Sequence, residues 1–185
     1  DGIFRFASIP SPTNRDFTLA VPFSIKFRPT IKRLNLDLIH VHSPFLLGRL
    51  GARYARRLGL PLVFTFHTLY DQYVHYVPFA KSFTRELAQR ISRDFCNQCD
   101  RVLIPTDVVG DYLRQIGVKA PVSKVPTGIK YDEFQKGDRD WLRRRYELAP
   151  GAKIMLFVGR LGQEKNVPFL LHGFSLTRKK IGDAC

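Results

Sequence analysis

The stretch from Ile154 to Asn166, IMLFVGRLGQEKN, contains the pattern from which the fold of this chain is predicted. Its apolar run, residues 153–158, is typical of a strand buried on both faces of a parallel sheet, and Gly159-Arg160 is where such a strand ends. Ligands of open α/β sheets collect beyond the carboxyl ends of the strands, near helix N-termini that favour anions. With Asn166 as the cap of the next helix, Arg160, Lys165 and that helix end are predicted to bind one phosphate group. The alternative is a solvated loop with two incidental bases.

The rest of the chain alternates between short apolar runs and amphipathic segments. Strands are predicted at residues 37–42, 62–66, 101–104 and 122–125, and helices at residues 45–58, 81–98, 105–117 and 167–180. This alternation is typical of a parallel, doubly wound, Rossmann-like α/β sheet. Before it, a short strand is expected at residues 3–6, then an irregular loop through Pro29 and a basic helix at residues 27–35.

The helix expected at residues 45–58 has strong boundaries. Ser43 is predicted as its N-cap, Pro44 lies at the first helical position, and Gly59 ends it. Apolar residues are predicted on one face and basic residues on the other; they are Leu47, Leu50, Tyr54 and Leu58, and Arg49, Arg53, Arg56 and Arg57.

A polar connector at residues 129–137, followed by a charged helix at 140–146, indicates a domain boundary near Lys136. We therefore expect a partial Rossmann-like domain at residues 1–135, lacking its first strands, and the start of a second one at residues 136–185. One βα unit cannot bury both faces of its strand, so the chain is expected to be truncated at both ends.

The chain of 185 residues is 44% hydrophobic and carries a net charge of +14, with the basic excess spread over both predicted domains. An anionic partner is indicated: nucleic acid, an anionic membrane surface or a phosphorylated substrate. No apolar run approaches the length of a membrane span and the N-terminal residues lack the pattern of a signal peptide. With an odd number of cysteines, 3, the composition favours a reducing cytoplasm, and Cys96-x-x-Cys99 is interpreted as ordinary thiols.

Several polar or flexible residues follow directly after predicted strands, which would place them at the carboxyl edges of two sheets. They are His42, His67, Thr106, Gly128 and Arg160. His40 and His42 point to the same side of their strand, but no carboxylate or cysteine stands near them, so no metal site is predicted. The D-x-D pattern of Asp138 and Asp140 could hold a metal, yet it falls where a helix needs an acidic start, and helix capping is preferred.

Some of these segments resemble a known family. Asp37-Leu-Ile-His-Val-His-Ser-Pro-Phe45, Phe64-Thr-Phe-His-Thr68 with Tyr70–Tyr76, Pro126-Thr-Gly-Ile129 and Phe157–Asn166 are similar, in order, to motifs of retaining glycosyltransferases of the GT-B fold, family four. The stretch from His67 to Tyr76 looks most like the bacterial diacylglycerol glucosyltransferases, which make glycolipid at the cytoplasmic face of the membrane.

The resemblance implies roles for particular residues. Arg160 and Lys165 would bind the diphosphate of a nucleotide sugar such as UDP-glucose and stabilise the leaving group, while Gly159 and Asn166 belong to the same donor-binding motif. His67 would lie at the transferred sugar and the acceptor, and Gly128 would let the chain between the domains approach the donor. No metal or further cofactor is implied, and the donor phosphate itself would help to take the acceptor proton. The basic helix faces would dock on anionic lipid, at the inner face of the cell membrane.

Two departures limit this expectation. The family's glycine-rich loop after its first strand and its paired glutamates in the second domain have no counterpart here, so the isolated chain is expected to be catalytically inactive. The acceptor could instead be a soluble sugar, a sugar phosphate or phosphatidylinositol. The alternative from another class is a basic nucleic-acid-binding α/β protein. Phe64, Phe66 and Phe157 argue against it, because they lie within predicted strands, where they would belong to the core and could not stack on bases.

Overall fold

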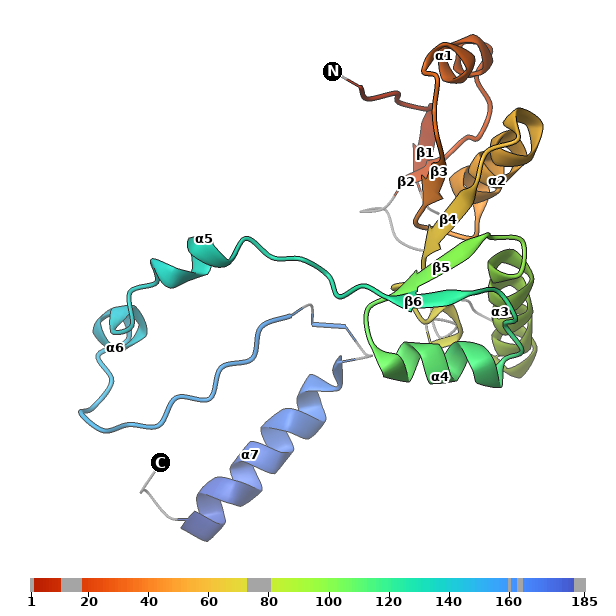
Figure 1. Ribbon diagram of the computed structural model, residues 1–185. Helices are drawn as coiled ribbons and strands as arrows, with labels where there is room; N and C mark the ends of the chain where they lie inside the picture. Colours follow the sequence, from red (N-terminus) through yellow and green to blue (C-terminus); the bar gives the residue numbers. More distant parts are fainter. Residues whose placement is uncertain (1, 11–17, 73–80, 160, 163–164, 182–185) are drawn as a thin grey trace. The chain divides into compact units, whose positions relative to one another are not determined.

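The computed structural model of the chain describes residues 2–10, 18–72, 81–159, 161–162 and 165–181 (Figure 1). The chain divides into two compact units, Asp1–Thr127 and Gly128–Cys185, and each is described by itself. The division lies somewhat before Lys136, because the chain leaves the sheet of the first unit directly after its last strand.

The first unit is built on a parallel sheet of four strands in the order β3-β4-β5-β6 (Figure 1). The strands are β3 (Ile39–Val41), β4 (Leu62–Thr65), β5 (Arg101–Ile104) and β6 (Val122–Lys124). The helices between them are α2 (Leu46–Leu58), α3 (Lys81–Cys96) and α4 (Asp107–Gln115). The predicted α/β class with a parallel, Rossmann-like sheet is confirmed.

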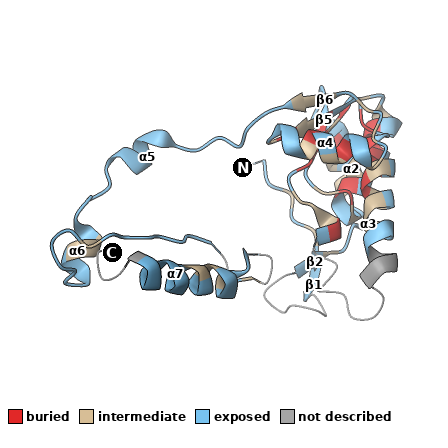
Figure 2. Cartoon of the chain, turned by 90° about the horizontal axis from the view of Figure 1, so that it is seen from below, coloured by how far each residue is buried: buried red, intermediate tan, exposed pale blue. Residues whose placement is uncertain are grey.

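One face of this sheet forms the core. Phe64 and Phe66, two residues apart on the same side of the chain at β4, are both fully buried. The ring of Phe64 lies 5.1 Å from that of Phe95 in α3, and the ring of Phe66 lies 6.1 Å from that of Tyr112 in α4. The connecting helices therefore cover the face that carries these phenylalanines, and Figure 2 shows the buried residues gathered in this unit.

The opposite face of the sheet carries polar and apolar side chains and is only partly buried. His40, Val63 and Thr65 alternate with the core residues of β3 and β4, and Arg101 and Ser123 do so on β5 and β6. His40 and Arg101 on this face are exposed. The far side of the sheet therefore presents hydrogen-bonding side chains together with the half-buried Val63 and Leu103.

The predicted apolar face of α2 packs on the core at Tyr54 and, half-buried, at Leu50 and Leu58, but not at Leu47. Leu47 is exposed, while Gly48, Ala52, Tyr54 and Ala55 are buried. A Cβ atom on Gly48 would lie 1.5 Å from the carbonyl oxygen of Ser43, so only glycine permits this approach of helix and preceding turn. Helix α2 begins after Phe45, and Ser43 Oγ accepts a hydrogen bond from the amide of Phe45 at 3.3 Å instead of acting as the N-cap. Gly59 ends the helix at φ 66°, as predicted.

The N-terminal segment also differs from expectation. The short strand predicted at residues 3–6 is absent from the described residues; β1 (Ser8–Pro10) and β2 (Thr18–Ala20) form an antiparallel pair instead. Phe4 and Phe6 pack their rings on Phe27 of α1 (Phe27–Arg33), at 5.1 and 4.8 Å, so their side chains stabilise a cluster and not a sheet.

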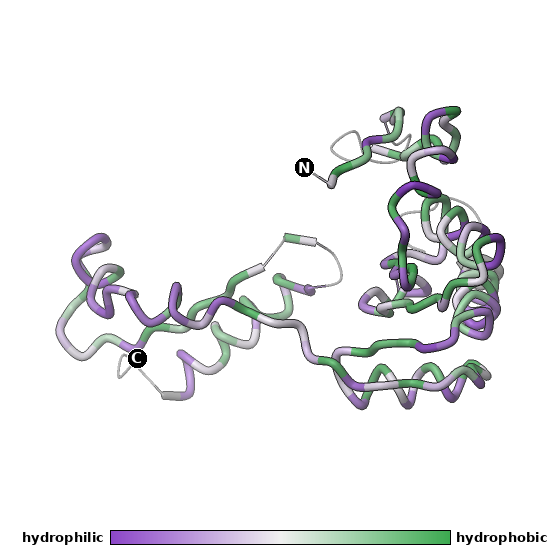
Figure 3. The backbone as a smooth tube through the Cα atoms, turned by 45° about the horizontal axis from the view of Figure 1, so that its top comes forward, coloured by the Kyte–Doolittle hydropathy of each residue, from purple (hydrophilic) through white to green (hydrophobic). Residues whose placement is uncertain are grey.

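The second unit contains α5 (Tyr131–Gln135), α6 (Trp141–Arg145) and α7 (Val167–Ile181). Helix α5 lies where a polar connector was predicted. The strand predicted at residues 153–158 is not formed, and Met155, Leu156 and Val158 are exposed. Figure 3 shows hydrophobic and hydrophilic stretches along the tube of this unit. A strand needs a neighbour for its backbone hydrogen bonds, and no described residue of this unit pairs with the segment.

The described helices include none that is long and apolar enough to cross a membrane.

Candidate functional site

The carboxyl edge of the first unit's sheet brings together histidines from neighbouring strands. His42 follows β3, and His67 comes two residues after β4; their rings lie 5.7 Å apart. His40, within β3, stacks on His42 with ring centroids 4.4 Å apart. The convergence of His42 and His67, expected from their places after parallel strands, is therefore found in the structure.

A hydrogen bond between strands fixes this row of rings. His40 Nε2 lies 2.7 Å from Thr65 Oγ1, which joins β3 to β4 on the open face of the sheet. Partial burial, and to a lesser degree the neighbouring His42, lower the pKa of His40 from the ordinary 6.5. A neutral imidazole can accept or donate at Nε2, so the row keeps hydrogen-bonding side chains at the edge where ligands of such sheets bind.

His67 is exposed and keeps its ring available. Among the described residues its ring makes one polar contact, with Thr68, whose Oγ1 lies 3.5 Å from His67 Nδ1. Backbone geometry holds it in place from the strand side, because the amide of Phe66 donates to the carbonyl of Leu103 at 2.8 Å. His67 is thus a side chain on a rigid strand end with a ring that faces no competing strong partner among the described residues.

The turn after His67 is anchored in the core by a buried carboxylate, which sequence analysis missed. Asp71 is 2% exposed, and its Oδ2 accepts a hydrogen bond from Gln89 Nε2 of α3 at 2.9 Å. Its Oδ1 has no hydrogen-bond partner among the described residues. Burial and then the charge of Asp71 raise the pKa of Tyr112 in α4 well above its usual range. No sequence signal marks Asp71, since its role depends on helices that follow much later in the chain.

Tyr70 packs the same turn against the start of α2. Its ring lies 5.0 Å from that of Phe45 and 6.1 Å from that of Phe66. Burial raises the pKa of Tyr70 above its usual value, and this effect outweighs the hydrogen bonds with Ser43 and Thr68, which lower it. The segment from His67 to Gln72 is therefore fixed on both sides, by α2 and by α3.

Two further predicted residues lie at strand ends without a specific contact. Thr106 is the N-cap residue of α4 but makes no side-chain capping hydrogen bond. Gly128 is exposed at the start of the second unit, and a Cβ atom there would meet nothing within 4 Å. Packing therefore does not require glycine at Gly128, and its predicted contact with the donor stays a prediction.

The predicted donor-binding loop lies in the second unit. Arg160 falls outside the described residues, as do residues 163–164. Lys165 is exposed, and its side chain makes no ion pair with any described residue. Asn166 adopts φ 46° directly before α7, where its carbonyl accepts hydrogen bonds from the amides of Phe169 and Leu170 at 3.0 and 3.2 Å. Lys165 therefore lies two residues before the start of α7 in the chain.

Asp138 turns the chain into α6. Its Oδ1 accepts from the amide of Asp140 at 3.0 Å, and its Oδ2 pairs with Arg144. These contacts, led by the backbone hydrogen bond, lower the pKa of Asp138. Asp138 thus makes contacts at the entry to α6, whereas Asp140, the N-cap residue, makes no side-chain capping hydrogen bond. Among the described residues, no group of three potential ligands could hold a metal ion.

A parallel α/β sheet with polar side chains along its carboxyl edge places this chain among proteins that bind ligands where their strands end. Within that class, residues 1–133 match the family model of Glycosyltransferase Family 4, and the chain belongs to this family. The resemblance stated from the sequence motifs is confirmed.

The chain spans about 40% of the length of the curated relatives it matches. It is 31% identical over 178 residues, 94% of this chain, to an alpha-monoglucosyldiacylglycerol synthase of Streptococcus pneumoniae. It is 26% identical over 90% of its length to the enzyme of the same name from Acholeplasma laidlawii, 44% of which is covered. A GDP-mannose-dependent alpha-mannosyltransferase of Corynebacterium glutamicum is 30% identical over 91% of this chain and 40% of the relative.

Proposed function

We propose that this chain forms the acceptor-side domain, and the beginning of the donor-side domain, of a retaining glycosyltransferase that transfers glucose from UDP-glucose to diacylglycerol. The observation that carries the proposal is His67, exposed at the carboxyl edge of the sheet, in a chain that is 31% identical to an alpha-monoglucosyldiacylglycerol synthase. Residues 1–135 would contact the acceptor and residues 136–185 would begin the nucleotide-sugar site.

In this proposal the protein mainly supplies position and charge. His67 holds a hydroxyl of the transferred sugar, or a backbone group beside the reacting carbon, on the rigid end of β4. The hydrogen bond between Thr65 and His40 holds the chain before His67, and the buried Asp71 holds the chain after it. Proton transfer from the acceptor goes to the donor phosphate, so no protein base is required at this step.

The donor diphosphate would be held by the loop before α7. Arg160 and Lys165 supply positive charge to a leaving group whose negative charge grows at the transition state. Gly159, Gly128 and Asn166 complete the donor-binding set by leaving room for the phosphates and by starting α7. No metal ion is part of this proposal.

The acceptor would be reached at an anionic membrane surface on the cytoplasmic side. Helix α2 carries exposed basic side chains, and each one near such a surface contributes on the order of 1 kcal/mol. They are Arg49, Arg53, Arg56 and Arg57. Binding to nucleic acid is not favoured, because Phe64 and Phe66 are fully buried and cannot stack on bases.

The test is transfer of labelled glucose from UDP-glucose to diacylglycerol in anionic vesicles, by a protein that joins this chain to a complete donor domain. We expect label in the organic phase, with the anomeric configuration of the donor. His67→Ala and Lys165→Ala should each reduce turnover by roughly 10²–10³-fold with little change in thermal unfolding. If a variant lost its folded structure along with its activity, the substituted residue would have a structural role instead.

A second candidate keeps the fold and changes donor and acceptor. The relatives include GDP-mannose-dependent alpha-mannosyltransferases and a D-inositol 3-phosphate glycosyltransferase that is 36% identical over 129 residues. Transfer to a soluble sugar, a sugar phosphate or phosphatidylinositol, with no label in diacylglycerol, would favour this candidate. If the protein neither transferred a sugar nor bound a nucleotide sugar, its relationship to the family would be one of fold alone.

A further inference from the structure

A network of hydroxyl groups, those of Ser43, Thr68 and Tyr70, leads to the imidazole of His67. The Tyr70 hydroxyl hydrogen-bonds with the hydroxyls of Ser43 and Thr68. Thr68 Oγ1 in turn lies 3.5 Å from His67 Nδ1. At the other end, Ser43 Oγ accepts a hydrogen bond from the amide of Phe45 at 3.3 Å. This hydroxyl network therefore connects a backbone amide to one ring nitrogen of His67.

The number of protons in the hydroxyl network decides the direction of its hydrogen bonds. The three hydroxyls carry three protons, and three side-chain contacts are available to them, two at Tyr70 and one at His67 Nδ1. The amide of Phe45 brings its own proton and takes up none of these contacts. If Nδ1 carried a proton, that proton would occupy the contact with Thr68, and one hydroxyl proton would lack an acceptor among the described residues. Because the three hydroxyl residues are half-buried, such a loss costs free energy, so Nδ1 is the acceptor.

Packing holds the middle of the hydroxyl network in place. The ring of Tyr70 lies 5.0 Å from that of Phe45 and 6.1 Å from that of Phe66. The next residue, Asp71, is 2% exposed and accepts a hydrogen bond from Gln89 Nε2 of α3 at 2.9 Å. The phenol group therefore has a fixed position between α2 and α3.

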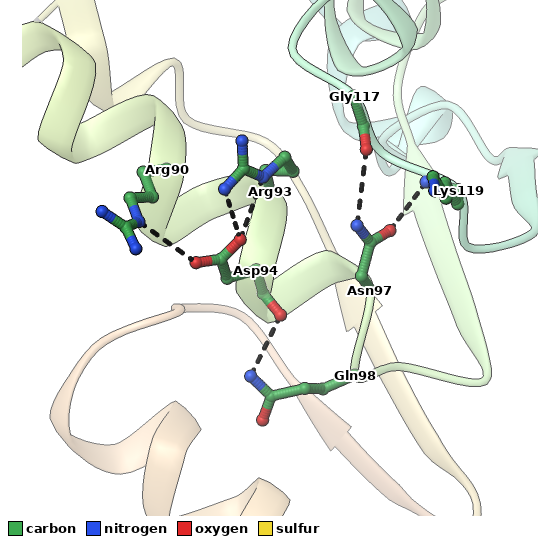
Figure 4. A network of polar contacts seen from close by, with 7 residues as sticks. All are labelled: Arg90, Arg93, Asp94, Asn97, Gln98, Gly117 and Lys119. Carbon is green, nitrogen blue, oxygen red and sulfur yellow. Dashed lines mark hydrogen bonds and ion pairs between the residues drawn. The ribbon is translucent and has the colours of Figure 1, made fainter.

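The helix that holds Asp71 is itself fixed at its end. Figure 4 shows Asn97, the residue after α3, bonded to the loop that leads into β6. Asn97 Oδ1 accepts from the amide of Lys119 at 2.7 Å, and Asn97 Nδ2 donates to the carbonyl of Gly117 at 3.4 Å. Helix α3 is thus tied to the sheet, which makes it a rigid support for the turn after His67.

The other ring nitrogen of His67 faces no partner. Nε2 makes no polar contact with any described residue, and the side chain is exposed. A neutral imidazole carries one proton, so a ring that accepts at Nδ1 carries its proton at Nε2. The edge of the sheet therefore presents a hydrogen-bond donor, which a hydroxyl or phosphate oxygen can accept.

We propose that Ser43, Thr68 and Tyr70 are positioning residues of the transfer reaction, which hold His67 as the tautomer that donates from Nε2 to an oxygen of the bound sugar. This inference rests on the proposed function for its substrate and deepens it, since it states which atom of His67 acts and in which direction the hydrogen bond runs. A nitrogen that already carries a proton cannot take one from the acceptor, which agrees with a transfer in which the donor phosphate takes it.

The tautomer is measured on the 185-residue chain by long-range proton–nitrogen NMR correlation of the histidine rings, at a pH where His67 is neutral. The chain has 5 histidines, and the spectrum of His67→Gln identifies the signals of His67. We expect Nδ1 of His67 to resonate as an unprotonated nitrogen and Nε2 as a protonated one. Because no nucleotide sugar is present, this result does not depend on whether the transferase proposal holds.

Variants with and without the hydroxyls test the cause. Thr68→Val should move the Nδ1 resonance toward that of a free imidazole, in which both tautomers are populated, and Tyr70→Phe should move it in the same direction by less. Thr68→Ser, which restores the hydroxyl, should return the resonance to its original position. Thr106→Val is the matched control, because Thr106 follows β5 at the same edge and makes no side-chain capping hydrogen bond. Far-UV circular dichroism checks that each variant is folded.

Turnover provides the second readout, in the protein that joins this chain to a complete donor domain. Thr68→Val and Tyr70→Phe should each reduce kcat roughly fivefold with little change in the KM for UDP-glucose, and Thr68→Ser should restore it.

Three results would overturn the proposal. They are a protonated Nδ1 in the unsubstituted chain, a tautomer that either Thr68→Val or Tyr70→Phe leaves unchanged, and unaltered turnover in variants whose tautomer has shifted. A joined protein that transfers no sugar would contradict the proposed function, and the NMR spectra would still decide whether the hydroxyl network sets the tautomer of His67.

Discussion

Gly48 shows how one residue sets the distance between a helix and the turn before it. A methyl group there would lie 1.5 Å from the carbonyl oxygen of Ser43, and a backbone atom cannot move aside as a flexible side chain can. We expect Gly48→Ala to destabilise the first unit by about 1–3 kcal/mol or more, measured by urea unfolding.

The same substitution at Gly173 is the control. Gly173 lies in α7, and a Cβ atom there would meet nothing within 4 Å. Alanine in place of an open helical glycine should leave stability unchanged or raise helix stability by about 0.5–1 kcal/mol. Equal losses at both positions would contradict the steric explanation for Gly48.

The lowered pKa of His40 makes stability depend on pH. Above pH 6.5, the pKa of the imidazole in the unfolded state, His40 is neutral in both states and contributes fully to the free energy of unfolding. As the pH falls from 6.5 through the lowered folded-state pKa, the unfolded state binds more protons, so stability is lost. We expect His40→Gln to reduce the fall in melting temperature between pH 7.5 and pH 5.5.

NMR titration of the imidazole protons measures the pKa of His40 directly, and it should lie below 6.5. His172→Gln, in the exposed helix α7, is the control for loss of one imidazole outside the sheet. A pH dependence that His40→Gln leaves unchanged would show that the fall in stability has another origin.

At the scale of the element, α3 ends at the buried thiol of Cys96, and a second buried thiol, Cys99, follows three residues later. Burial, ahead of the neighbouring negative groups, raises the pKa of both Cys96 and Cys99 to about 12. Cys99 Sγ lies 3.3 Å from the carbonyl oxygen of Phe95, to which it donates, and neither cysteine forms a disulfide. Both cysteines are buried and free, which agrees with the interpretation of this C-x-x-C as ordinary thiols.

These thiols should resist modification in the folded chain. At pH 8 the thiolate fraction is on the order of 10⁻⁴, so a Cys185→Ser variant should react with a disulfide reagent only as it unfolds. The reaction rate measured across a urea titration should follow the unfolding transition. Rapid reaction of one thiol in the native chain would show that α3 exposes its C-terminal end.

At the scale of the whole molecule, the buried core belongs entirely to the first unit. Every buried hydrophobic side chain of the described residues lies between Ile31 and Leu113, whereas the described residues from Gly128 onwards are exposed or half-buried. Residues 1–127 alone should therefore unfold cooperatively at a melting temperature within a few degrees of that of the full chain. A much lower melting temperature would mean that the second unit stabilises the first.

The sequence by itself determined the elements whose signals are local. Arg101–Ile104 was predicted with its observed bounds, and the helix ending at Gly59 was predicted because a glycine that adopts positive φ follows a run of helical spacing. His42 and His67 could be placed at one edge because parallel strands all end on the same side of a sheet.

Only the tertiary structure decided the features that depend on neighbours distant in the chain. The apolar run at residues 153–158 has strand composition but no described strand beside it, so its backbone has no ladder to join. Asp71 became an anchor only where Gln89 and Tyr112 packed against it, and His40 paired with Thr65 only through the register of β3 and β4. Local sequence fixes backbone conformation and the direction of side chains, whereas partners, register and burial follow from how the elements pack.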